Sequence, residues 1–110
     1  MYFFRFMVRP SEENEEYGKV AGAYANCWVS INSLPQAEKK IRQYLAEGYW
    51  RVEKIDEVLV TRMKDNLEDP ESLRYYREAK EEGLCVVLHK WPLKTSQRKT
   101  KQTVQNRKRK

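Results

Sequence analysis

The spacing of apolar side chains changes at Ser33, and this change constrains the fold more than any other feature of the sequence. Before Ser33, apolar residues alternate with polar ones, as in half-buried strands; after it, they recur every third or fourth residue, as in an amphipathic helix. Ser33 and Gln36 match a capping box at a helix start, and Gly48 is a common kind of helix end. The apolar stripe predicted for this helix consists of Ala37, Ile41, Tyr44 and Leu45.

Two strands are predicted before this helix, over residues 2–9 and 22–31. The segment PSEENEEYG at residues 10–18 separates them, and its proline, glycine and four glutamates are typical of a loop between antiparallel strands. Alternation directs one set of side chains toward the helices. This set is Phe4, Phe6 and Val8 in the first strand and Ala23, Ala25, Cys27, Val29 and Ile31 in the second.

The second half of the chain predicts a strand, a helix and a final strand. Residues 50–62 are rich in Val, Ile and Leu, but their alternation slips, which indicates a strand with a bulge or bend near residues 54–56. The next helix starts at the N-cap Asp69, which is followed by proline, and ends at Gly83. Residues 84–91 form the last predicted strand.

The order β-β-α-β-α-β predicts an α+β domain with two layers. We expect a four-stranded, mostly antiparallel sheet with both helices on one face. The layers resemble those of ferredoxin-like domains, although the element order differs from the β-α-β-β-α-β of that fold. Residues 1–93 are enough for one core without metal or disulfide, so they are expected to form a single domain, and residues 94–110 a tail.

Positive charge is concentrated in this tail. Residues 94–110 contain eight Lys and Arg and no acid, a charge of +8, whereas residues 1–93 contain fourteen Lys and Arg against sixteen Asp and Glu, a charge of −2. A segment so polar and so strongly charged cannot form a core, and we expect it to be disordered. The candidate nucleic-acid-binding residues are Arg98, Lys99, Lys101, Arg107, Lys108, Arg109 and Lys110.

Three interpretations of the tail follow from its charge. It can neutralise nucleic-acid phosphates without sequence preference, in which case log affinity falls with log salt at a slope of up to roughly −7. It can equally be a solubilising extension without a dedicated partner. An anionic membrane surface is the third target, although no amphipathic pattern or acyl-acceptor motif accompanies the charge.

The sheet face away from the helices is predicted to be open and unusually aromatic. Its candidate partner-binding or ligand-binding residues are Arg5, Tyr24, Asn26, Trp28, His89 and Trp91. Such a face is typical of a surface that pairs with a second copy, receives a protein or ligand, or stacks unpaired bases. Cover by the loop at residues 10–18 is the structural alternative.

His89 is the only histidine and is the candidate general acid or base of this face. Such a role requires a partner within hydrogen-bond reach, and Cys85 lies about 13 Å away along the same strand face. A partner would have to come from a neighbouring strand, with Arg5, Tyr24 and Asn26 as candidates. The alternative is a partly buried structural histidine.

No cofactor or metal is expected. Glycine-rich nucleotide loops, G-x-S-x-G and H-E-x-x-H are absent from the sequence. One histidine and two cysteines on opposite sheet faces cannot supply a tetrahedral metal site, and the same parity argues against a Cys27 to Cys85 disulfide. The glutamates of residues 12–16 lack calcium-loop spacing and are interpreted as solvated, with weak return of the tail onto them as an alternative.

The cysteines and the apolar segments also bear on location. Cys27 and Cys85 are far apart, and the first residues lack the apolar stretch of a signal peptide, which predicts reduced thiols in a cytoplasmic protein. No segment approaches the roughly 20 apolar residues of a membrane span.

Two functional hypotheses result. The first is a small non-enzymatic interaction module that self-associates as a homodimer or docks a protein partner through the open face, with a basic tail able to contact nucleic acid. The alternative is a small enzyme or ligand-binding protein with a pocket around His89. His89→Ala discriminates them, because it leaves association intact in the first case and abolishes ligand binding or activity in the second.

Overall fold

The structure is a computed structural model that describes residues 1–93; the expected boundary at residue 94, the expected disorder of the tail and its basic candidates lie outside the described residues. The elements are β1 (Tyr2–Pro10), β2 (Val20–Val29), α1 (Leu34–Glu47), β3 (Trp50–Val60), the 3-10 helix η1 (Met63–Asn66), α2 (Pro70–Glu82) and β4 (Leu84–Pro92). None of these helices is long and apolar enough to cross a membrane.

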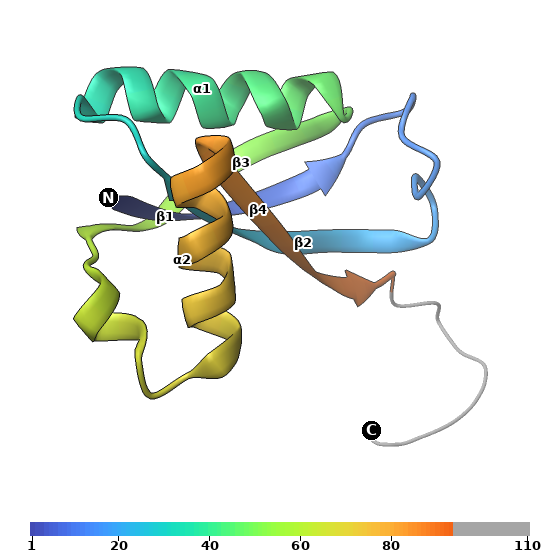
Figure 1. Cartoon of the computed structure of the whole chain (residues 1–110). Coiled ribbons are helices and arrows are strands. Elements are labelled where there is room, and N and C mark those ends of the chain that lie inside the picture. The colour runs from blue at the N-terminus through green and yellow to red at the C-terminus, as the bar shows by residue number, and fades with distance from the viewer. Residues whose placement is uncertain (94–110) are drawn as a thin grey trace.

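The four strands form one antiparallel sheet in the order β3-β1-β2-β4 (Figure 1). The predicted class, an α+β fold with a four-stranded antiparallel sheet and two helices, is confirmed. The sequence-adjacent strands β1 and β2 occupy the centre, whereas β3 and β4 form the two edges. Because paired residues of antiparallel strands share a face, the register decides which side chains meet.

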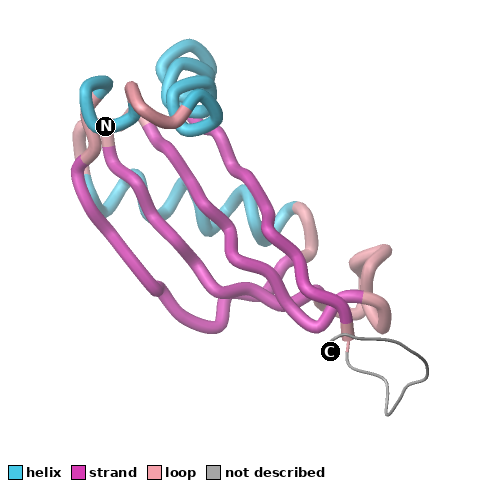
Figure 2. Tube along the Cα trace, turned by 90° about the horizontal axis from the view of Figure 1, so that it is seen from below, coloured by secondary structure: helices cyan, strands magenta, loops and turns pink. Residues whose placement is uncertain are grey.

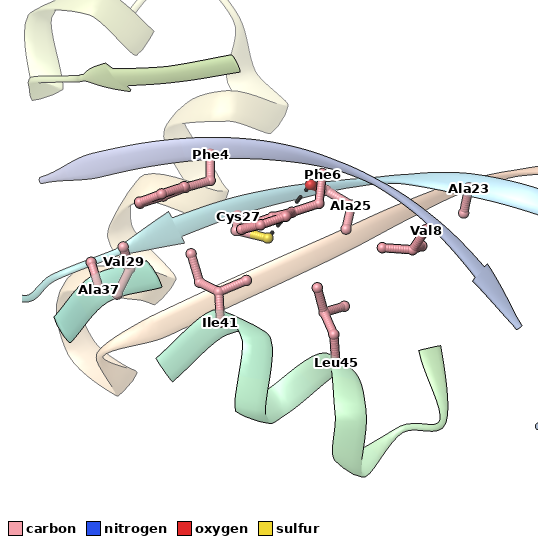
Figure 3. Packing of buried hydrophobic residues seen from close by; sticks show 10 residues of the cluster. All are labelled: Phe4, Phe6, Val8, Ala23, Ala25, Cys27, Val29, Ala37, Ile41 and Leu45. Atoms are coloured by element: carbon pink, nitrogen blue, oxygen red, sulfur yellow. Dashed lines mark hydrogen bonds between the residues drawn. The ribbon is translucent and has the colours of Figure 1, made fainter. Parts of the chain in front are cut away.

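The helix α1 begins as its sequence predicts. The Ser33 hydroxyl accepts a hydrogen bond from the Gln36 N–H at 3.5 Å, and Gly48 follows the last turn. The helix packs on Phe4, Phe6 and the other inward residues of β1 and β2, which confirms their predicted orientation (Figure 3). Its buried residues are Ala37, Ile41 and Leu45.

The apolar stripe predicted for α1 is wrong at one residue, Tyr44. Tyr44 is 51% exposed. The buried positions advance by four residues at each step, so the line of contact drifts around the helix and leaves Tyr44 at its margin.

The two helices do not share a face, which corrects the expected two-layer arrangement. Cys27 belongs to the cluster under α1, whereas its strand neighbour Trp28 is buried with Ala79 of α2 and with Cys85. Successive residues of a strand point to opposite faces, so α2 covers one end of the face that was expected to be open. The reason is the apolar pair Trp28 and Cys85, which requires cover that α1 cannot give. Figure 2 shows α1 along the far side of the strands and α2 end-on, near the N-terminus.

The edge strand β3 carries the predicted irregularity. Its register with β1 shifts between Arg5 and Phe6 and again between Met7 and Val8, which leaves Asp56 and Glu53 without a partner in the ladder. The bulge expected near residues 54–56 is therefore confirmed, with a second shift beside it. Beyond the bulges the strand ends in an exposed apolar stretch, Val58, Leu59 and Val60.

The loop between β1 and β2 is tied to the α1 side of the sheet. The buried Asn14 side chain donates to the carbonyl oxygens of Gly48 and Tyr49, both at 3.1 Å, and Glu16 pairs with Lys90. Lys90 lies opposite Ala23 in the register and so shares the face of α1. The hydrogen bonds and the ion pair of this loop thus direct it away from Tyr24 and Trp91, so they do not support the loop-cover interpretation.

Both cysteines are free and lie on opposite faces, each within a cluster. Burial, with a smaller repulsion from Cys85, raises the pKa of the Cys27 thiol from 9.0 to about 12. The unfolded chain therefore releases this proton above pH 9, while the folded chain retains it until about pH 12. The contribution of Cys27 to stability is complete below pH 9 and is lost as the pH rises through this window.

This linkage predicts a measurable slope in stability. Between pH 8 and pH 10.5, we expect the unfolding free energy of the wild-type chain to fall by about 2 kcal/mol more than that of Cys27→Ala, because the variant lacks this thiol. Urea unfolding of both proteins at the two pH values measures it, and comparing differences cancels the pH-independent effect of losing the sulfur. An equal fall in both proteins would contradict the assignment.

Candidate binding groove

A groove of about 430 Å³ lies on the sheet face opposite α1, where the segment from η1 to α2 rises beside the strands. We call this feature the α2 groove. Its sheet side is formed by Phe3, Arg5, Asn26, Trp28, Leu59 and His89. Its other wall is formed by Thr61, Asp65, Asn66, Asp69, Glu71, Ser72 and Tyr75.

Arg5 is the centre of a polar row that crosses three strands. Its Nε donates to Asn26 Oδ1 at 2.9 Å, and its Nη1 lies 3.4 Å from Glu57 Oε1. Register explains the row, because Arg5 of β1 lies opposite Asn26 of β2 on one side and Glu57 of β3 on the other. The guanidinium also lies 5.8 Å from the Phe3 ring centre and 6.0 Å from that of Tyr24. Arg5 is thus held in place, with its charge balanced by a carboxylate.

The floor of the groove is aromatic, and Trp28 is its deepest part. The indole meets the Phe3 ring edge-on with ring centres 5.0 Å apart, and the Tyr75 ring of α2 lies 5.1 Å away. Trp28 is only 6% exposed. The expectation of an exposed Trp28 on an open face is therefore wrong, because α2 covers it. Stacked bases cannot reach an indole that is already enclosed by two rings.

The wall of the groove is fixed by short polar contacts around η1. The buried Asn66 amide donates to Thr61 Oγ1 at 3.0 Å and to the Arg62 carbonyl oxygen at 2.7 Å. The Thr61 N–H in turn donates to the Met1 carbonyl oxygen at 2.8 Å, which joins the wall to the start of β1. The two walls of the groove are thus joined through hydrogen bonds.

The carboxylates of this wall also have structural roles. Asp65 accepts from the Arg62 N–H at 2.9 Å, and Asp69 accepts from the Glu71 N–H and the Ser72 hydroxyl. The positive end of the α2 dipole amounts to roughly half an elementary charge. Three carboxylates, Asp65, Asp69 and Glu71, therefore leave this side of the groove negative, since Arg5 is already paired.

The remaining predicted residues lie on the same face but differ in their relation to the groove. His89 is exposed, lies opposite Tyr24 in the register and lines the groove. Tyr24 and Trp91 lie beside the groove and form a pair with ring centres 5.2 Å apart. The Trp91 indole occupies the space over Gly22, where an added Cβ would lie 2.6 Å from Trp91 Cζ2. Four of the six predicted residues thus line one groove, and two flank it.

Sequence reasoning missed the entire second wall. The sequence predicts Asp69 only as a helix cap, and no sequence motif marks Asp65 or Ser72 as part of a site. Tyr75 offers one signal, since it adds an aromatic ring beside the helically spaced residues Leu73, Tyr76 and Ala79 of α2. Its meaning depends on knowing that α2 crosses to the face of Trp28, which the strand order alone does not determine.

Within residues 1–93, no group of three or more His, Cys, Asp or Glu side chains is arranged to hold a metal ion. No protein-family model matches the chain, and no curated protein or solved structure is significantly similar to it.

Proposed function

We propose that this protein is a small non-enzymatic interaction module that docks a segment of a protein partner in the α2 groove. In this proposal the basic residues 94–110 contact nucleic acid without sequence preference. The observation that supports docking most directly is the groove itself, with its aromatic floor and preorganised Arg5. Its wall also carries three carboxylates, which we call the rim: Asp65, Asp69 and Glu71. The two free thiols accord with a reducing compartment such as the cytoplasm.

Binding accounts for these groups better than catalysis does. Arg5 is engaged by Asn26 and Glu57, and Asp69 caps α2, so both are committed to holding the structure. Fixed polar groups around an apolar floor are typical of binding sites, where they set orientation while the floor supplies contact area. A reaction would instead require an activated group that exchanges protons or attacks a substrate. His89 also lines the groove, but no side-chain hydrogen bond within residues 1–93 joins it to an activating partner, and Asn26 Oδ1 already accepts from Arg5.

The negative charge of the rim determines which kind of partner peptide the α2 groove can bind. Within residues 1–93, Asp65, Asp69 and Glu71 form no ion pair, so their carboxylates attract lysine and arginine side chains. The Tyr75 ring is already in contact with Trp28 and with the Arg74 guanidinium, 5.0 Å from its ring centre, so the attraction rests on the carboxylates. A basic peptide is therefore the partner segment that fits, and polyphosphate is repelled from the groove.

Two neighbouring lysine substitutions test the proposal. Leu59 lines the groove and is 40% exposed, whereas Val60 is 59% exposed and points to the opposite face of the same edge strand. The probe is labelled deca-arginine, titrated by fluorescence anisotropy against residues 1–93, which retain every described contact. We expect Leu59→Lys to weaken binding about tenfold through charge and lost contact area, and Val60→Lys to weaken it less than twofold.

The pair is matched, because each variant adds one positive charge at an exposed edge position. Equal weakening by both variants would show a diffuse charge effect and contradict the groove. Deca-glutamate serves as the control for charge sign and should not bind. If deca-arginine itself fails to bind at low salt, the docking proposal is wrong.

A further inference from the structure

We infer that the α2 groove is occupied within the same molecule by the chain's own basic residues 98–101. This inference rests on the proposed function, because it names the segment that the groove holds when no other partner is present. Residues 98–101 read RKTK and place three positive charges within four residues. The rim offers three carboxylates, those of Asp65, Asp69 and Glu71.

The point at which the described chain ends supports binding in cis. β4 runs from the α2 end of the sheet to Pro92, and His89 of this strand lines the groove. Leu93 is four residues further along, which is about 14 Å at the rise of a strand. Residues 94–98 can span about 17 Å when extended, so RKTK can reach the groove from the end of β4.

Charge complementarity distinguishes residues 94–110 from the rest of the chain, and within them residues 98–101 are the basic cluster that the shorter tether joins to the groove. Residues 1–93 carry a net charge of −2, and all eight remaining positive charges follow in residues 94–110. A tether of this length gives an effective concentration on the order of 1 mM or more. The groove is then at least half occupied in cis whenever the same segment binds in trans with a Kd of about 1 mM or tighter.

A second negatively charged surface is the alternative binding site for residues 98–101. A hollow of about 600 Å³ on the α1 side is lined by Glu13, Glu15, Glu16 and Glu47. Glu16 there is already paired with Lys90, and Glu13 accepts from the Ser11 hydroxyl at 3.2 Å. This hollow also contains aromatic rings, those of Tyr49 and Trp50, but Lys90 lies 5.9 Å from the Trp50 ring centre and already places a positive charge there. Among residues 1–93 no lysine lines the α2 groove, and Arg5 is paired with Glu57 rather than with the three wall carboxylates, so we assign the segment to the groove and let the experiment separate the two surfaces.

The test is paramagnetic relaxation with a spin label at Thr100→Cys in the full-length chain. Cys27 and Cys85 are buried, so the new thiol is labelled selectively. At low salt we expect the label to broaden the amide resonances of Leu59, Ser72 and Tyr75 at least threefold more than those of Glu13 and Glu15. The selective broadening should disappear in 0.5 M salt and in Leu59→Lys, but persist in Val60→Lys.

A mixture of isotope-labelled chains without spin label and spin-labelled chains without isotope detects binding between molecules. Broadening of the groove resonances in this mixture as strong as in the single chain would overturn the cis assignment in favour of a second copy. Broadening centred on Glu13 and Glu15 would also overturn it. If deca-arginine binds the groove but the label broadens nothing selectively, this inference fails and the proposed function stands; if deca-arginine does not bind, both fail.

Discussion

Replacing Trp28 by alanine is expected to lower the free energy of unfolding by about 3–5 kcal/mol, the range for removing a large buried aromatic side chain. Trp28 is buried with Ala79 and Cys85 in the cluster under α2. Its ring connects the sheet to this helix, because it contacts Phe3 of β1 and Tyr75 of α2. Its loss should release α2 before the sheet, because the cluster under α1 does not include it. Urea unfolding measures the first effect, and hydrogen exchange of the α2 amides measures the second.

Tyr24→Ala is the matched control for this substitution. Tyr24 lies on the same strand and the same face, but it is only half buried and pairs with Trp91 rather than with α2. We expect it to lower stability by about 1 kcal/mol and to leave exchange in α2 unchanged. Should Trp28→Ala leave no folded protein, Trp28→Phe gives a smaller loss with the same effect on α2. Equal losses for Trp28 and Tyr24 would contradict the role assigned to Trp28.

Removing residues 94–110 is expected to abolish nucleic-acid binding. This step changes the net charge from +6 to −2, and the remaining domain presents a negative groove. For the full chain, eight charges predict a loss of affinity of about 10³- to 10⁵-fold between 50 and 200 mM salt. Fluorescence anisotropy with a labelled 20-nucleotide single strand and the matching duplex measures binding by the full and the truncated chain across this range.

Two controls define what this result means. A full-length chain in which the Lys and Arg residues of 94–110 are replaced by glutamine should behave as the truncated chain does. Retention of single-strand binding by residues 1–93 would instead identify the sheet face as the nucleic-acid surface. If neither the full chain nor the truncated one binds, the nucleic-acid part of the proposal is wrong.

Much of the fold follows from local sequence signals. The change of period at Ser33, the caps at Ser33 and Asp69, and Gly83 with its left-handed φ of 92° each act over a few residues. Alternation then fixes which side chains face α1, because neighbouring residues of a strand cannot share a face. The slipped alternation of residues 50–62 likewise marked the bulges of β3.

The placement of α2 could not be obtained in the same way. Both helices have an apolar stripe, and a stripe alone does not say which face of a sheet it meets. The deciding contact joins Trp28 of β2 to Ala79 of α2 and requires knowing that β2 pairs with β4. For the same reason, Arg5, Asn26 and His89 could be named from the sequence, whereas the wall formed by Asp65, Asp69 and Tyr75 could not.

The central claim, that the α2 groove receives a basic segment, is tested most directly by mapping where such a segment binds. Amide chemical shifts of isotope-labelled residues 1–93 are recorded during a titration with deca-arginine at low salt. Our account predicts that the largest shifts fall on groove residues, including Arg5, Leu59 and Tyr75. Largest shifts at Glu13, Glu15 and Glu47, or no localised shifts at all, would contradict it.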